Sequence, residues 1–155
     1  MSDIVDQLKR KEMMAGIRNK NTQPEMVIRK GLFAKGYRYR LHKKGLVGKP
    51  DMILPKYRAA IFINGCFWHC HDCHLFKWPQ TRKEFWENKI LSNKARDEVN
   101  KISLMQSGWR ILIVWECALK GKTKLDLVRL IDEIESWIVS NSDYVTICGP
   151  NKGLK

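Results

Sequence analysis

Residues 59–74 read AAIFINGCFWHCHDCH, a short apolar run followed at once by a crowd of metal-binding side chains. The run AAIFI predicts a deeply buried strand. The DMIL of residues 51–54, separated from it by PKYR, predicts the other strand of a hairpin. Three cysteines and three histidines then stand between residues 66 and 74. The sequence therefore predicts a buried strand that leads straight into a metal-binding or catalytic loop.

The segments on either side of this hairpin predict an α/β layer built on a mixed sheet flanked by helices. The TQPE of residues 22–25, with its threonine as cap, predicts a helix that ends at Gly36. YRYRL at 37–41 alternates like a half-buried strand. WRILIVWEC at 109–117 predicts a strand buried on both faces, and 123–140 has the apolar spacing of a final helix.

A long helix is predicted from a capping box, Thr81 with Glu84, toward Ser107. Five apolar residues share one face of this helix and are expected to form its core stripe: Leu91, Ala95, Val99, Ile102 and Met105. The opposite face carries Trp86, Asn93, Asp97 and Asn100. A Trp and an Asp that face away from the core are hard to explain by packing.

A chain of 155 residues fits one domain, with residues 1–20 expected as a DNA-binding arm, 21–140 as the core and 141–155 as a tail. Its formal net charge of +13 favours a polyanion partner, above all nucleic acid, although a basic chain can also simply be soluble. The expected phosphate or base contacts are Arg38, Arg40, Lys43, Lys44 and Lys49. Without a long apolar run or a signal-peptide pattern, we expect no membrane partner and a cytoplasmic location.

The five cysteines favour a cytosolic metal site over a disulfide framework, because their number is odd and three of them are crowded among histidines. Cys66, His71 and Cys73 offer three zinc ligands from one loop. Cys117, at the end of the second buried strand, offers a distant fourth. The spacing does not say which of the neighbouring candidates are excluded: Cys70, His69 and His74. It is not the pattern of a DNA-reading zinc finger.

Asp51, in GKPDMIL, stands at the head of a strand, where many nucleases hold Mg²⁺ with a carboxylate. The next strand offers no second carboxylate and no Lys, so main-chain carbonyls, water or phosphate oxygens would complete the shell. His69 suits a general base that Asp97 orients, or else it is a zinc ligand or a solvated loop residue. An acidic residue at a helix start, such as Glu25, is more often simply a partner of the helix dipole.

Several stretches together resemble the very short patch repair (Vsr) DNA mismatch endonucleases: NTQPEMVIRKGL, GKPDMIL, IFINGCFWHCHDCHLFKWPQTRKEFWENKI, ARDEV and GWRILIVWECALKGK. The resemblance runs from about residue 14 to 122. It implies a restriction-endonuclease-like fold and a magnesium-dependent enzyme that nicks one strand 5′ to the thymine of a T:G mismatch. In that family the mismatch arises by deamination of 5-methylcytosine, which implies a functional link to a cytosine-5 DNA methyltransferase and to repair machinery at the bacterial nucleoid.

The resemblance also implies roles for single residues. The structural zinc ligands would be Cys66, His71, Cys73 and Cys117. The magnesium ligands would be Asp51 and the main-chain carbonyl of Ile63. The other active-site residues would be His69 as general base, Asp97 as its partner and Glu25 as a further acid. The DNA contacts would be an aromatic wedge of Phe67, Trp68 and Trp86 in the major groove, and Met14 in the minor groove.

Two departures from the family stand out. Asn64 occupies the place of a second active-site histidine, and an amide neither carries positive charge nor shuttles a proton. Cys70 and Asp72 replace residues that are often histidines, which makes Cys70 a competing zinc ligand. A restriction-type endonuclease on matched duplex and a zinc-stapled DNA-binding module with weak catalysis stay open as alternatives, as does a core role for Phe67 and Trp68. One nick needs one active site, so we expect a monomer.

Overall fold

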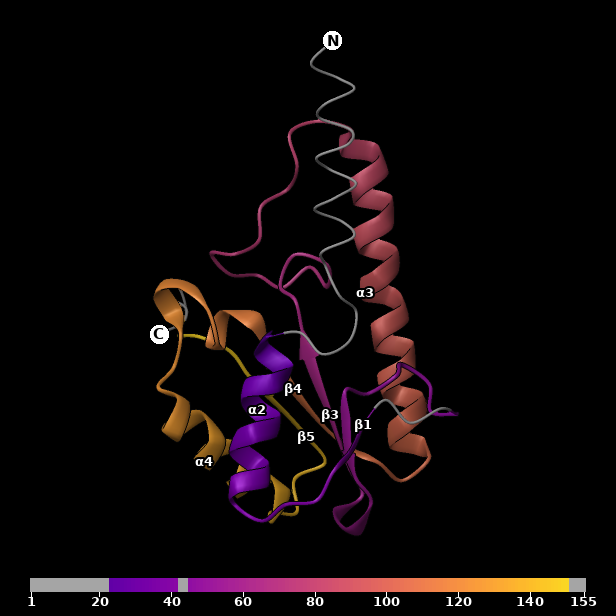
Figure 1. The fold of residues 1–155 in the computed structure, drawn as a ribbon. Coiled ribbons are helices and arrows are strands. Elements are labelled where there is room, and N and C mark those ends of the chain that lie inside the picture. Colours follow the sequence, from indigo (N-terminus) through magenta and orange to yellow (C-terminus); the bar gives the residue numbers. More distant parts are fainter. Residues whose placement is uncertain (1–22, 42–44, 151–155) are drawn as a thin grey trace.

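A computed structural model describes residues 23–41 and 45–150. Within these residues five strands form one sheet in the order β1-β2-β3-β4-β5 (Figure 1). The strands are β1 Arg40–Leu41, β2 Met52–Leu54, β3 Ala59–Asn64, β4 Arg110–Trp115 and β5 Tyr144–Ile147. The helices are α2 Gln23–Ala34, α3 Lys83–Gln106 and α4 Leu127–Ile138, with short 3-10 helices η1 Pro55–Tyr57, η2 Glu116–Ala118 and η3 Gly121–Thr123. The predicted α/β fold is confirmed.

The sheet is mixed, as the sequence predicts. β1, β2 and β3 pair in antiparallel fashion, whereas β3, β4 and β5 run parallel. The register of β3 and β4 extends from Ala59 opposite Arg110 to Asn64 opposite Trp115. Both strands therefore end at the same edge of the sheet, and the segments that follow them start side by side.

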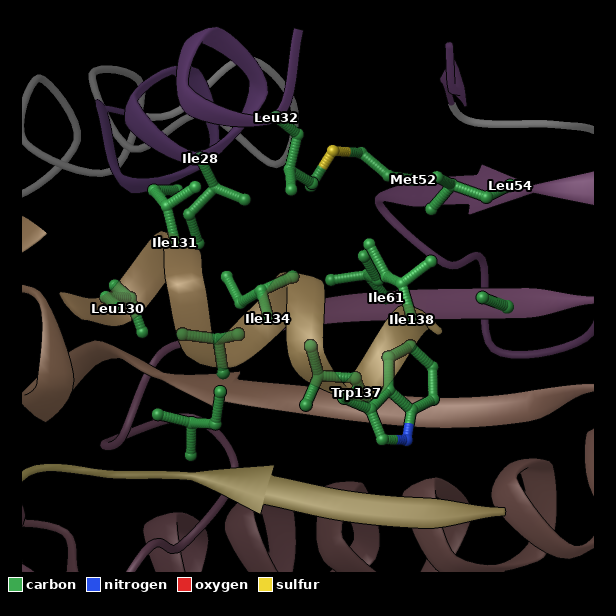
Figure 2. Packing of buried hydrophobic residues seen from close by; sticks show 14 of the residues in the cluster. Ile28, Leu32, Met52, Leu54, Ile61, Leu130, Ile131, Ile134, Trp137 and Ile138 are labelled. Atoms are coloured by element: carbon green, nitrogen blue, oxygen red, sulfur yellow. The ribbon is translucent and has the colours of Figure 1, made fainter. Parts of the chain in front are cut away.

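Helices cover both faces of the sheet. α2 and α4 pack on one face over the larger core, whose buried side chains include Ile28, Leu32, Met52, Ile61, Ile134 and Trp137 (Figure 2). α3 packs on the other face over a smaller core of Ile53, Ala60, Leu104, Trp109 and Ile111. Because strand residues alternate between faces, Asn64 and Trp115, at the ends of β3 and β4, belong to the α3 side.

Three element boundaries differ from those expected. Only Arg40 and Leu41 of the predicted strand 37–41 pair with β2, and both are exposed. α4 starts at Leu127, where the Asp126 side chain accepts a hydrogen bond from the Arg129 N–H, and not at residue 123. Within the expected tail 141–155, residues 144–147 form β5, which the sequence analysis did not predict. The expected threonine cap of α2 lies outside the described residues.

The start of α3 and its core stripe were predicted wrongly. The helix begins at Lys83 after Arg82 in a left-handed conformation, and no side chain caps it, so the capping box is absent. Three of the five predicted core residues are about half exposed or more: Leu91 51%, Val99 64% and Ile102 48%. Ala95 is also exposed, Met105 is half-buried, and the fully buried residues are Ile90 and Leu104.

The physical reason is visible in Figure 1, where α3 continues well past the end of the sheet. Only its last turns, around Leu104, have a sheet to cover. Farther up, the inward side of the helix borders the loop after β3 and carries the polar Asn93 and Asp97 as well as the buried Ile90. The spacing of apolar residues along a helix does not show whether the helix packs against an apolar core or against a loop with polar groups.

The crossing of α2 over α4 yields a first prediction. A Cβ atom added at Gly31 would lie 2.5 Å from Cδ1 of Ile131, a buried residue of α4. We expect Gly31→Ala to lower the free energy of unfolding by about 1–3 kcal/mol through overpacking, although Ala is ordinarily the better helix former by about 1 kcal/mol. Urea denaturation measures the change. Lys30→Ala, at an exposed position of the same helix, is the control and should stay close to wild type; a stabilised Gly31→Ala would contradict the tight crossing.

Candidate active site

A cleft of about 780 Å³ opens at the edge where β3 and β4 end. The predicted site residues that line it are Glu25, Lys49, Asp51, Ile63, Asn64, Phe67, Trp68 and His69. Asp97 lines a small adjoining cavity together with Asn64. The exposed Arg38 and Arg40 do not line either cavity, and Met14, Lys43 and Lys44 lie outside the described residues.

One corner of the cleft concentrates negative charge. Oδ2 of Asp51 accepts a hydrogen bond of 2.6 Å from the N–H of Ile63. Glu25, only 2% exposed, pairs through Oε2 with Nη2 of Arg29 at 2.8 Å. Burial raises the pKa of Asp51 to about 7, with a further rise from nearby Glu25, while the Ile63 N–H and Arg29 oppose it. Near neutral pH, Asp51 is therefore only partly ionised, and added positive charge in this corner would favour its ionised form.

The Asp51 corner fits the expected magnesium ligands. In an extended strand the N–H and C=O of one residue point to the same side, so the Ile63 carbonyl faces the side of the Asp51 carboxylate. A carboxylate and a carbonyl on a cleft wall are oxygen ligands of the kind that Mg²⁺ takes, with water or phosphate for the remaining positions.

His69 is held by α3. Its Nδ1 forms a hydrogen bond with Oδ2 of Asp97, which occupies that nitrogen and leaves Nε2 for the cleft. One turn earlier, Nδ2 of Asn93 donates to the Trp68 carbonyl at 3.2 Å. The face of α3 opposite the predicted core stripe thus contacts the loop after β3 at two consecutive residues, Trp68 and His69.

The four expected zinc ligands converge in space. The ligand atoms of Cys66, His71, Cys73 and Cys117 all lie within 4.8 Å of one another. Nδ1 of His71 is 3.4 Å from Sγ of Cys66 and 3.7 Å from Sγ of Cys117. Tetrahedral zinc, with Zn–S of about 2.3 Å and Zn–N of about 2.0 Å, sets such atoms roughly 3.6 Å apart. Three thiols and an imidazole at these spacings fit a structural zinc ion.

The candidates left open by the spacing are occupied elsewhere. His69 bonds to Asp97, and Nδ1 of His74 lies 3.4 Å from Oγ1 of Thr123. Cys70 adopts a left-handed conformation and does not join the cluster among the described residues. The competing role considered for Cys70 is therefore not supported by its position.

Burial controls the protonation of the cluster. It raises the pKa of the Cys66 and Cys117 thiols and lowers that of His71, so the imidazole stays neutral with a lone pair to offer. The N–H of Gly149, just beyond β5, donates to Sγ of Cys117 at 3.3 Å and counteracts part of the shift. Gly149, in the segment expected as a tail, thus contacts one of the four residues that form the metal cluster, Cys66, His71, Cys73 and Cys117.

Aromatic rings gather beside this cluster. Ring centroids are 5.1 Å apart for Phe67 and Trp68, 5.6 Å for Phe67 and Trp86, and 5.9 Å for Trp68 and Trp86. All three side chains are partly exposed, so the alternative that Phe67 and Trp68 are core residues does not hold. Edge-to-face and tilted packing keeps the rings together while leaving surface free for contact.

Sequence reasoning missed Glu116 and Lys120, which line the same cleft. Oε1 of Glu116 accepts a hydrogen bond from the N–H of Cys66 at 3.2 Å, and Oε2 lies 3.5 Å from Nζ of Lys120. The strand after Asp51 indeed brings no second carboxylate, but the end of β4 does. Adjacency to Cys117 in sequence was the only available signal, and it becomes informative only once β3 and β4 are known to be parallel.

Comparison with known proteins gives a consistent result. The family model described as DNA mismatch endonuclease Vsr matches residues 2–75. The chain is 43% identical over 138 residues to the DNA mismatch endonuclease Vsr of Escherichia coli (strain K12), covering 89% of this chain and 88% of that protein. It is 42% identical over 126 residues to the type II nicking enzyme V.XorIIP of Xanthomonas oryzae pv. oryzae, covering 81% and 93%. No helix in the described part of the chain has the length and apolarity to cross a membrane.

The convergent cluster predicts one zinc ion per chain. We expect Cys66→Ser and Cys117→Ser to lose zinc and to unfold at lower temperature, since each removes a ligand from a buried site. Cys70→Ser and Cys148→Ser, which alter thiols outside the cluster, are the matched controls and should keep full zinc content. Metal analysis by mass spectrometry and thermal unfolding provide the readouts. Zinc loss in Cys70→Ser with retention in Cys117→Ser would refute the ligand set.

The raised pKa of Asp51 predicts a pH-dependent stability. A carboxyl whose pKa is about 7 when folded and 3.8 when unfolded stabilises the fold below pH 4 and loses that contribution as the pH rises through 7. We expect Asp51→Asn, which still accepts the Ile63 hydrogen bond, to be more stable than wild type above pH 7, with a smaller difference at pH 5.5. Urea denaturation of zinc-loaded protein in buffer without Mg²⁺ tests this; a difference that does not grow with pH would contradict it.

Proposed function

Because this chain belongs to the family of the DNA mismatch endonuclease Vsr, a family of DNA endonucleases, we propose that it nicks duplex DNA 5′ to the thymine of a T:G mismatch in a Mg²⁺-dependent reaction. The observation that carries this proposal is the single cleft that combines the Asp51 corner with His69 and borders the aromatic cluster. Acidic metal ligands, a general base and exposed rings are the three components that such a reaction requires.

Proton transfer is assigned to His69. With Nδ1 bonded to Asp97, the neutral ring keeps Nε2 as a proton acceptor toward the cleft. Asp97 fixes the tautomer and stabilises the imidazolium that forms when Nε2 takes a proton from the attacking water. Asn64 lines the cleft but carries no charge and accepts no proton at neutral pH, so it does not share this role.

Asp51 and the Ile63 carbonyl are the proposed Mg²⁺ ligands, and Glu25 is the further acid beside them. Mg²⁺ bound there would supply positive charge to the scissile phosphate and lower the pKa of a coordinated water. The chain itself contributes the Asp51 carboxylate, whose pKa burial raises, and Lys49 and Lys120 on the cleft wall for phosphate contacts.

Mismatch selection is assigned to Phe67, Trp68 and Trp86. Inserting rings between base steps costs a few kcal/mol for each unstacked step, and this cost is lowest where the pairing is already imperfect. The zinc cluster holds the loop that carries Phe67 and Trp68, since Cys66 directly precedes them and His71 follows shortly after. A rigid wedge converts the lower unstacking cost of a T:G step into preferential binding.

The proposed partner is therefore double-stranded DNA with a T:G mismatch. A cytosine-5 methyltransferase would create the methylated sites whose deamination gives that mismatch, and repair enzymes would act on the nick. One cleft provides one cut, which suits a monomer working in the cytoplasm on the bacterial chromosome.

Strand-specific nicking tests the proposal. Labelled duplexes carry either a T:G pair or the matched C:G pair, in several flanking contexts, with and without Mg²⁺. We expect cleavage only of the T strand of the mismatch and only with Mg²⁺. Asp51→Ala should abolish it while duplex binding persists, because it removes a metal ligand. Asp143→Ala, at the opposite edge of the sheet, is the control and should cut normally.

The other outcomes identify other functions. Cutting of the matched duplex would indicate a restriction-type endonuclease on the same fold. Binding without cleavage in every context would indicate a zinc-stapled DNA-binding module. Either result overturns mismatch-dependent nicking.

A further inference from the structure

Trp115, the last residue of β4, touches two histidines of the loop after β3. Its indole ring stacks on the ring of His71, with centroids 4.2 Å apart and planes inclined by only 9°. It also meets the ring of His69 edge-on, at 6.2 Å and 69°. One side chain therefore links a ligand of the metal cluster to the histidine assigned as general base.

The sheet fixes where this indole lies. Trp115 is opposite Asn64 in the parallel register of β4 and β3, at the point where β3 leads into the loop. The next two residues of the chain also hold that loop, since Glu116 accepts the Cys66 N–H and Cys117 joins the metal cluster. The indole is thus anchored in the sheet, and its rings face a loop that is tied down on either side.

The contacts of His69 show what the indole adds. Among the contacts found in the described structure, the His69 ring has one polar partner, Asp97, through Nδ1. A single hydrogen bond fixes the position of one ring nitrogen, but it leaves the ring free to tilt about that contact. Nε2, at the far side of the ring, moves most in such a tilt. An edge contact with a rigid indole restricts this motion.

We propose that Trp115 is a positioning residue for His69: stacked on His71, it fixes the plane of the His69 ring and so the direction in which Nε2 faces the cleft. This role rests on the proposed function, in which His69 accepts the proton. Displacing a general base by about an ångström can lower the rate by about two orders of magnitude, so a side chain that fixes the ring orientation has a large effect on the rate.

A purely structural role predicts something different. If Trp115 only stabilised the metal cluster through His71, its loss would lower zinc content or thermal stability and leave the His69 ring unchanged in protein that keeps its zinc. If it positions His69, the His69 ring changes in zinc-loaded, folded protein.

The test compares Trp115→Leu and Trp115→Phe with wild type, and uses Trp109→Leu as the matched control. Trp109 is a buried indole just before the opposite end of β4, far in register from the loop. All proteins are full-length and zinc-loaded, with zinc content and thermal unfolding measured first. Two readouts follow: the NMR signal of the His69 Nδ1–H proton that bonds to Asp97, and single-turnover nicking of the T:G duplex beside its affinity measured with Ca²⁺.

We expect Trp115→Leu to keep zinc and duplex affinity, to lose or broaden the His69 Nδ1–H signal, and to nick roughly ten- to a hundredfold more slowly. Trp115→Phe, which keeps an aromatic edge, should restore the signal and most of the rate. Trp109→Leu should lower stability without changing either His69 readout.

Trp115→Leu with wild-type rate and an intact His69 signal would overturn the proposal, as would a loss of activity that follows zinc loss alone. The NMR measurement needs no substrate. It therefore decides whether Trp115 positions His69 even if the wild-type protein fails to nick T:G duplexes, a failure that would count against the proposed function and not against the positioning.

Discussion

The parallel pairing of β3 with β4 is the constraint on which the cleft depends. Parallel strands cannot be joined by a tight turn, so a long connection must return the chain to the starting edge, and α3 provides it. Both strands then release the chain at the same edge. The segment after Asn64 and the segment after Trp115 become neighbours, although some fifty residues separate them. The metal cluster and the Glu116 hydrogen bond both span this junction.

Helix α3, which makes this connection, also holds the loop after β3, a role that its apolar spacing does not indicate. A crossover helix is usually judged by the apolar stripe it offers to the sheet. α3 has such a stripe, yet much of it faces solvent, while Asn93 and Asp97 point to the loop and hold Trp68 and His69. The helix continues past the ends of the strands that it covers, and the part beyond them borders the candidate site (Figure 1). Asn93 and Asp97, together with the buried Ile90 and the ring contacts of Trp86, therefore join this part of the helix to the loop after β3.

The features that could be predicted from sequence are those that depend on residues close together in the chain. The buried runs at 52–54, 59–64 and 110–115 gave the strands, because continuous apolar residues have few alternatives. The crowding of Cys and His residues indicated a metal site, but the spacing left Cys70, His69 and His74 open, and the set of four followed from the resemblance to the Vsr family. β5 was missed because it is short and largely exposed and is defined by its pairing with β4. The inward face of α3 was misjudged because along much of its length it meets the loop after β3 and not the sheet. Glu116 was missed for a related reason: its role depends on a register that sequence alone does not reveal.

The two proposed metal sites serve opposite needs. Phe67 and Trp68 of the loop after β3, and Trp86 of α3, could not serve as the proposed DNA contacts if they were buried, because burial would remove the surface that binds. A zinc ion bound by the loop ligands and Cys117 would tie the loop to η2, directly after β4, and give it rigidity without that loss. The Asp51 corner works the other way: burial raises the pKa of the Asp51 carboxyl, and a cation that arrives with the phosphate would favour its ionised form. Zinc would thus be a permanent part of the fold, whereas Mg²⁺ would be drawn in by an electrostatic demand that the fold leaves partly unmet. The loop between Cys66 and Cys73 carries Phe67 and Trp68 of the proposed wedge and also His69, so a zinc ion bound there would hold the proposed DNA contact and the proposed proton acceptor in place together.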